Sequence, residues 1–219
     1  MRSDVLVVTG AGRYGDPWHD FPATSARLAQ LLRQAGLRVA VASTDDPPTA
    51  QEARLVVVNA GGGAAALPGT ADDACSRWRE YVIDHALRGG PVLAVHAATN
   101  TFYDEPRWWE LLGGRWLPGV SSHPPLERSM VQITEHRHPI TAGWDDFEVR
   151  DERYSHLQVV SDSVLVTHTY DGDSHPIVWT NRWHRAFVVV DTLGHDVAAY
   201  GPNRRALLER EIDWLLREG

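Results

Sequence analysis

The stretch GGPVLAVHAATN, residues 89–100, decides the fold, because an uninterrupted apolar run ends there in His96. Residues 91–95 do not alternate between polar and apolar side chains, which is typical of a strand buried on both faces. Two glycines precede this run, and small residues follow it. We therefore predict a central parallel strand with helices on both sides and with His96 at its carboxyl end.

The position of His96 indicates a functional site, because ligands of open α/β sheets bind beyond the carboxyl ends of the strands. A neutral imidazole also exchanges protons near neutral pH. This interpretation predicts a ring presented to the crevice. The alternative is a core histidine bonded to a backbone carbonyl. Asn100, later in the same stretch, is a candidate for substrate binding.

Length and composition favour one domain over residues 1–219, with 43% hydrophobic residues to form its core. The net charge of −8 argues against a nucleic-acid partner. No apolar run approaches the roughly 20 residues that cross a bilayer, so no membrane partner is expected.

Cys75 is the single cysteine, which excludes an intrachain disulfide and favours the cytoplasm. Its helical spacing predicts a buried thiol without a catalytic role. A homo-oligomer is compatible with this composition.

The remaining pattern alternates strands and helices, which predicts an α/β fold with a doubly wound, mostly parallel sheet and helices on both faces. Strands are expected over residues 5–8, 37–42, 55–58, 129–134, 164–169, 177–180 and 186–190. Helices are expected from a cap at Thr24 or Ser25 to residue 36, from a Thr70/Asp73 capping box to residue 85, near residues 108–112, and over residues 205–216. Prolines around residues 123–139 place that region at the edge of the sheet or in connections.

The loop after the first strand, residues 9–21, is rich in glycine and polar side chains. Its Gly10-x-Gly12 pattern resembles a dinucleotide-binding motif, but no helix opens directly after it and Pro17 intervenes. We therefore expect no nucleotide cofactor and interpret the loop as a substrate loop. Its candidate contact residues are Trp18, His19 and Asp20.

Polar or small residues follow the other strands in the same way. Gly61, Gly62 and Gly63 end the strand at residues 55–58 and would allow backbone N–H groups to approach an anion or oxyanion; a flexible turn is the alternative. The nine Trp and eleven His of the chain favour a polar, ring-shaped ligand such as a sugar.

The segment with Asp151 and Glu152 places two adjacent carboxylates near Tyr154. Neighbours on a strand face opposite sides, so we expect one carboxylate in the cleft and prefer Asp151. Tyr154 is expected to stack on a sugar ring or donate its hydroxyl. His123 precedes two prolines, and this constrained loop suits a ligand contact or a structural role.

His195 and Asp196 directly follow the last strand, where they are candidates for an acid/base pair or a simple strand cap. Histidines and carboxylates in such number also suit a zinc-like divalent metal, since these groups are its usual ligands. No His-x-x-x-His spacing is present, so such a metal needs ligands from separate loops. The cofactor and the identity of any metal ligand stay open at this point.

Several phrases, in the same order, together resemble the trehalose-utilisation, or ThuA-like, family. They are Gly90–His96, His123-Pro124-Pro125, His138-Pro139-Ile140, Asp151-Glu152-x-Tyr154, His175–Thr180 and Leu193–Asp196. This resemblance spans nearly the whole chain and implies a flavodoxin-like sheet related to class I glutamine amidotransferases. Those relatives carry a nucleophilic cysteine after the central strand. His96 occupies that place here, so the resemblance implies no thiol chemistry. The segment at residues 14–17 departs from the family pattern and leaves His19 without an implied role.

The family resemblance implies processing of glucosides or their keto derivatives. We therefore expect acid/base, or metal-assisted, chemistry on a carbohydrate. The expected catalytic residues are His96, Asp151, His195 and Asp196. The expected substrate-binding residues are His19, Gly61, Gly62, Asn100, His123, Glu152 and Tyr154. The rival interpretation is a sugar-binding or regulatory domain without catalysis.

Overall fold

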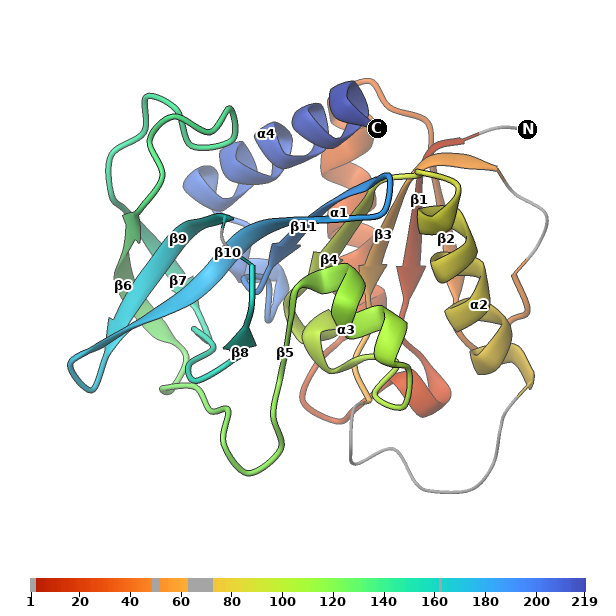
Figure 1. Ribbon diagram of the computed structural model, residues 1–219, viewed down its shortest axis with the longest axis horizontal. Coiled ribbons are helices and arrows are strands. Elements are labelled where there is room, and N and C mark those ends of the chain that lie inside the picture. The colour runs from red at the N-terminus through yellow and green to blue at the C-terminus, as the bar shows by residue number, and fades with distance from the viewer. Residues whose placement is uncertain (1–2, 49–51, 63–72, 162) are drawn as a thin grey trace.

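The computed structural model describes residues 3–48, 52–62, 73–161 and 163–219, except for the side chains of residues 73–75 (Figure 1). Its helices are α1 (Phe21–Gln34), α2 (Asp73–Leu87), α3 (Pro106–Leu112) and α4 (Pro202–Glu218), with short 3₁₀ helices η1 (Gly12–Tyr14), η2 (His96–Asn100) and η3 (Val197–Ala199). Its strands are β1 (Ser3–Thr9), β2 (Val39–Ser43), β3 (Ala53–Asn59), β4 (Val92–Val95), β5 (Gly114–Arg115), β6 (Glu127–Ile133), β7 (Phe147–Asp151), β8 (Gln158–Val159), β9 (Ser163–Tyr170), β10 (Asp173–Trp183) and β11 (Ala186–Asp191).

Nine strands form one mixed sheet in the order β2-β1-β3-β4-β11-β10-β9-β6-β7. The first five of these strands run parallel, and the rest continue the sheet in antiparallel pairs. The predicted α/β fold is confirmed, with its parallel strands at one end. As predicted, β4 is central, and the four residues of this strand are fully buried.

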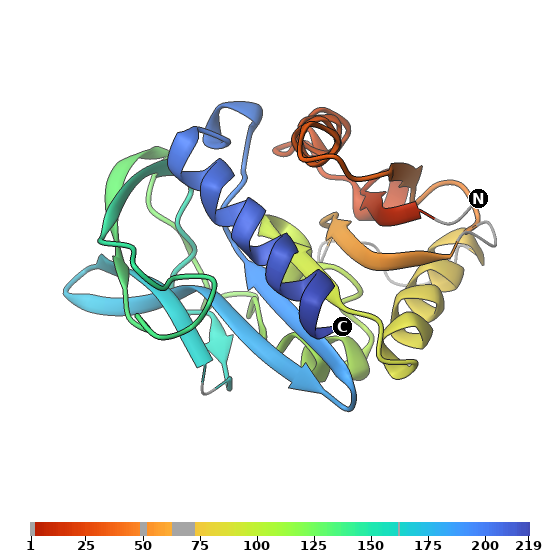
Figure 2. The same cartoon turned by 90° about the horizontal axis from the view of Figure 1, so that it is seen from above.

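Helices cover both faces of the sheet, so the apolar runs are buried on both sides. Leucines of α1 and α4 share one core cluster with Val5, Val57 and Leu93. Trp78 of α2 and Trp108 of α3 belong to the cluster on the opposite face (Figure 2). No helix in the described part of the chain is both long and apolar enough to cross a bilayer.

The start of α1 differs from the prediction. Asp20, and not Thr24 or Ser25, caps this helix by accepting the Ala23 backbone N–H at 3.0 Å. Thr24 and Ser25 lie inside the helix, and their hydroxyls accept from the Asn59 amide at 2.9 Å each. Their burial against the end of β3 therefore replaces the expected capping role.

The antiparallel end of the sheet is larger than predicted. The segment 147–151 forms β7, the outer strand, and β10 extends through Pro176. Pro176 pairs with β9 alone, because the pairing of β10 with β11 begins at Val178, so its missing backbone donor falls where one side of the strand has no partner strand. The predictions for Gly63, Thr70 and the Cys75 side chain lie outside the described residues.

Candidate active site

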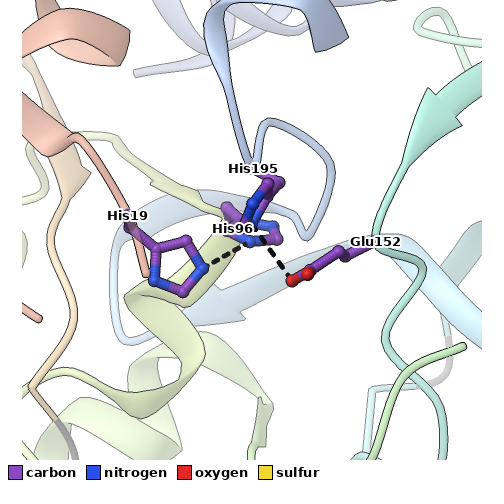
Figure 3. Close-up of side chains that lie close together, drawn as sticks. All are labelled: His19, His96, Glu152 and His195. Atoms are coloured by element: carbon purple, nitrogen blue, oxygen red, sulfur yellow. Dashed lines mark hydrogen bonds and ion pairs between the residues drawn. The ribbon is translucent and has the colours of Figure 1, made fainter. Parts of the chain in front are cut away.

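Four side chains from four separate loops meet at the carboxyl ends of the parallel strands. His19 follows β1, His96 follows β4, His195 follows β11 and Glu152 follows β7, and they point toward one another (Figure 3). Each offers a nitrogen or oxygen atom, and these atoms all lie within 4.8 Å of one another. We call these residues the His3Glu cluster.

The surroundings of His96 fix one tautomer of its imidazole ring. Its Nδ1 atom lies 2.7 Å from the Thr192 carbonyl oxygen, which only accepts, so Nδ1 carries the hydrogen. Burial is the main cause that holds the pKa of His96 well below its ordinary value, and the nearby His19 ring is the second. His96 is therefore neutral, and the lone pair on Nε2 faces the cluster.

The expectation that His96 is presented to the crevice is wrong, because the residue is only 1% exposed. The rings of His19 and His195 pack around it, with centroid distances of 4.9 and 5.5 Å. These two rings come from distant loops whose paths the sequence does not specify. The side chain is nevertheless part of the cluster through Nε2, which lies 3.1 Å from both His19 Nε2 and the Tyr154 hydroxyl.

Asp16 fixes the His19 ring in the same way. Both Asp16 carboxylate oxygens lie 2.8 Å from His19 Nδ1, and one of them also accepts the backbone N–H groups of Trp18 and His19 at 2.9 Å. Nδ1 therefore donates to Asp16, and Nε2 of His19 points at His96. The loop after β1 delivers its histidine already oriented.

Glu152 and His195 form the other half of the cluster. Glu152 Oε2 lies 3.0 Å from His195 Nδ1, but the angles are not those of a hydrogen bond, and Nδ1 has no such partner among the described residues. The adjacent Glu152 carboxylate raises the pKa of His195. Burial raises the pKa of Glu152, but the contacts with His195 outweigh it and lower that pKa overall.

Asp151 does not face the pocket, although it was the preferred carboxylate. Its buried side chain accepts backbone N–H groups from Glu152 at 2.9 Å, Gly194 at 2.6 Å and His195 at 3.1 Å. Burial raises the pKa of this carboxyl group to about 7. The alternation of side chains along the strand thus gives Glu152 to the site and leaves Asp151 to hold the loop that carries His195.

Asp196 is not brought to the cluster either. Its carboxylate pairs with Arg150 at 2.9 Å and caps η3 by accepting the Ala199 backbone N–H at 2.9 Å. It therefore has a structural explanation for following the last strand. His123 lies nearer to the cluster, with Nε2 3.8 Å from Glu152 Oε2.

A pocket of about 430 Å³ opens beside the cluster. It is lined by Asp16, Trp18, His19, Gly61, Gly62, Ala97, Asn100, Trp116, His123, Glu152 and Tyr154. The lining includes His19, Gly61, Gly62, Asn100, His123, Glu152 and Tyr154, which were expected to bind substrate, and Trp18 of the substrate loop. Asp20 of the same loop is not in the lining and caps α1 instead. Trp18 is 71% exposed, whereas Tyr154 is buried and stacks edge-on against Trp116 at 4.9 Å.

Sequence reasoning missed two contributors to the site. Asp16 lies three residues before His19 within the divergent segment, and an acidic residue so close to a histidine was the available signal. Trp116 gave no such signal, because its approach to Tyr154 depends on the path of a long connection.

The family model for ThuA, described as trehalose utilisation, matches residues 4–215. The chain belongs to the ThuA family. Two solved structures of ThuA-like proteins resemble this ThuA-family chain. The one from Parabacteroides merdae ATCC 43184 is 20% identical, with a TM-score of 0.75 over 99% of this chain and 90% of that chain. The one from Bacteroides uniformis ATCC 8492 is 16% identical, with a TM-score of 0.72 over 96% and 90%.

A more distant likeness extends beyond the ThuA family. A Thermoplasma acidophilum protein described as part of a GMP synthase is 12% identical, with a TM-score of 0.60 over 99% of this chain and 96% of that chain. At this identity the likeness shows the fold alone. It supports the predicted relation to the glutamine amidotransferase-like fold. No curated protein matches the chain.

Proposed function

We propose that this ThuA-family protein is an enzyme that processes a glucoside or a keto derivative of one. The single observation that carries the proposal is the His3Glu cluster at the wall of an aromatic pocket. Two of its members, His19 and Glu152, line that pocket directly. The family description, trehalose utilisation, supports a carbohydrate as the substrate class.

The pocket has the form that a sugar requires. Its volume of about 430 Å³ lies within the usual range for small-molecule sites. The exposed indole of Trp18 offers an apolar face to a sugar ring, while Asn100 and His123 offer polar atoms to its hydroxyl groups. These three lining residues thus supply the apolar and polar contacts that a carbohydrate needs.

The proposed reaction moves a proton at a sugar carbon or at the glycosidic oxygen. His123 and Glu152 both line the pocket, with 3.8 Å between the imidazole Nε2 and the carboxylate Oε2. A base and an acid placed on one ligand position allow removal and return of a proton. Tyr154 keeps its proton, because burial and the nearby carboxylates raise its pKa well above the ordinary value, and its hydroxyl serves as a donor.

The second candidate function is sugar binding without catalysis. The burial of His96 favours it, since a histidine that is 1% exposed has no direct contact with a ligand. The two functions differ in a simple observable. A binding domain returns the sugar unchanged, whereas the proposed enzyme converts it or exchanges its hydrogens.

The test follows glucosides and keto-glucosides in D₂O by proton NMR with the parent protein and with Glu152→Gln. We expect product formation, or loss of a carbon-bound hydrogen signal, with the parent, and at least about a 100-fold slower change with the variant. Asp145→Asn is the matched control, because this exposed side chain lies in the connection between β6 and β7. Saturable sugar binding with no chemical change in the parent would favour the binding domain.

A further inference from the structure

The protonation pattern of the His3Glu cluster has an unusual consequence. His96 donates from Nδ1 to the Thr192 carbonyl, and His19 donates from Nδ1 to the Asp16 carboxylate. Neutral imidazoles with these donors carry lone pairs on Nε2. The two Nε2 atoms nevertheless lie 3.1 Å apart and face each other. The Tyr154 hydroxyl lies 3.1 Å from His96 Nε2 and can donate to it, a contact that metal binding would replace. The two facing Nε2 lone pairs still repel each other at this distance unless a proton or a metal ion lies between them.

His195 and Glu152, the other two members of the cluster, also lack a hydrogen bond between their closest atoms. His195 Nδ1 is buried without a hydrogen bond among the described residues, yet it lies 3.0 Å from Glu152 Oε2. Their approach is that of an ion pair, and both atoms lie within 4.8 Å of the donor atoms of His19 and His96. Figure 3 shows the three rings and the carboxylate converging from separate loops.

We propose that His19, His96, His195 and Glu152 bind one divalent transition-metal ion, of which zinc is the best match. Three imidazole nitrogens and one carboxylate oxygen form a donor set that zinc takes readily. Ligand atoms on a tetrahedral zinc ion lie roughly 3.4 Å apart, given metal–ligand distances of about 2.0–2.1 Å. Two of the observed separations, 3.0 and 3.1 Å, are close to this value. The four donor atoms lie within 4.8 Å of one another, so the widest pair would draw together when one ion binds.

The surroundings of the cluster resemble those of ligands in known metal sites. Metal-bound histidines usually donate their other ring nitrogen to a carboxylate or a backbone carbonyl. Asp16 and the Thr192 carbonyl provide one of each. The competing arrangement is a single proton shared by the two Nε2 atoms. That proton satisfies His19 and His96 but leaves His195 Nδ1 with only its ion-pair contact to Glu152 Oε2 at 3.0 Å.

The metal would add a chemical role to the proposed function. That catalytic role rests on the proposed function, whereas the binding of the metal does not. With all four side chains bound, a tetrahedral ion would have no free position, so contact with a sugar oxygen would require a fifth ligand. In that arrangement the ion would supply Lewis-acid polarisation of a sugar carbonyl or hydroxyl oxygen at the pocket wall. Glu152 would then hold the ion and would not act as the base, and His123, which lines the pocket but is not a ligand, would move the proton. Tyr154 would keep its proton and donate a hydrogen bond. This division of roles explains why the site is rich in histidine.

The binding test uses protein stripped with a chelator and then desalted after addition of Zn²⁺, Co²⁺ or Mn²⁺. We expect one ion per chain by elemental analysis, visible absorption bands with Co²⁺ and a raised melting temperature. His19→Gln and Glu152→Gln should weaken binding by at least about 100-fold, and Asp16→Asn by about 10–100-fold. His136→Gln, an exposed histidine between β6 and β7, is the control and should bind like the parent.

Two outcomes would overturn the metal site: a parent protein that retains no stoichiometric ion, or ion binding that is equal in the parent and in the Glu152→Gln variant. Circular dichroism verifies that each variant is folded. Sugar conversion is measured in parallel. Full conversion by the stripped protein refutes the metal and leaves the function standing. A parent protein that binds one ion but neither binds nor converts the sugar refutes the proposed function and leaves the metal site standing.

Discussion

The buried carboxylate of Asp151 accepts the backbone N–H of His195 at 3.1 Å, so the residue before Glu152 holds the loop that carries the histidine beside Glu152. The same carboxylate accepts the Gly194 N–H at 2.6 Å. One buried side chain thereby fixes the relative positions of two cluster members that are distant in sequence. Asp151 is a positioning residue and does not itself reach the pocket.

Asp151→Ala should destabilise the protein by about 2–4 kcal/mol, because three backbone N–H groups lose their buried acceptor. Urea denaturation measures this loss. Asp145→Ala, which removes an exposed carboxylate, is the control and should stay within about 0.5 kcal/mol of the parent. Equal stability of the two variants would refute the positioning role.

His96 permits a matched pair of substitutions that separates folding from function. His96→Asn places an amide N–H near Nδ1, so it should retain the bond to Thr192 and cost about 1 kcal/mol, while removing Nε2 from the cluster. His96→Gln extends toward Nε2 but abandons Thr192, and should cost about 1–3 kcal/mol.

Both His96 variants should lose at least about 10–100-fold in turnover if Nε2 serves the site by holding the proposed metal ion. Melting curves and rates per folded molecule test this expectation. A His96→Asn variant with parental turnover would show that the ring is only a structural core histidine.

Trp18 should bind the sugar without contributing to stability, because its indole is 71% exposed at the pocket. We expect Trp18→Ala to weaken sugar binding by about 1–2 kcal/mol, or about 5–30-fold, and Trp18→Phe to weaken it less. Titration calorimetry measures the affinity. Tyr103→Ala removes an exposed aromatic residue outside the pocket lining and should bind like the parent, so equal losses in both alanine variants would contradict the prediction.

His168 predicts a pH dependence of stability that does not involve the cluster. Burial lowers its pKa from 6.5 to about 4, and the buried ring donates from Nε2 to the Tyr154 carbonyl at 3.0 Å. Because the unfolded chain takes up the proton first, this stabilisation is complete above about pH 6.5 and is lost as the pH falls toward 4.

Between pH 7 and 4.5, the free energy of unfolding should fall by roughly 2 kcal/mol more in the parent than in His168→Gln. Urea denaturation at several pH values gives both curves, and the other acidic groups affect them alike. Parallel curves would show that His168 is not held neutral by the fold.

The convergence of the candidate site histidines was predictable from the sequence, because the carboxyl ends of parallel strands meet at one edge. His19, His96 and His195 follow three such strands, and they lie together. The burial of His96 was not predictable, since it depends on rings from distant loops. The preference for Asp151 over Glu152 failed for a related reason: the sequence shows that neighbours face opposite sides but not which side faces the pocket.

The antiparallel half of the sheet was harder to predict. The edge strand β7 combines apolar and charged residues, and Pro176 within β10 argues against a strand paired on both sides. In the folded chain Pro176 pairs only with β9, and β11 joins the strand from Val178 onward, an arrangement that the local sequence does not reveal. Local patterns therefore identified the parallel elements more completely than the strands that extend them.

The most direct test of the account is a crystal structure of the protein with a bound glucoside or keto-glucoside. We predict density for a sugar ring in the pocket lined by Trp18 and Trp116, with a polar atom of the ligand within about 3.2 Å of Glu152 or His123. A second pocket of about 570 Å³, lined by Arg54 and Arg88, lies at the amino ends of the strands. Sugar density confined to that pocket would contradict the assignment of the active site.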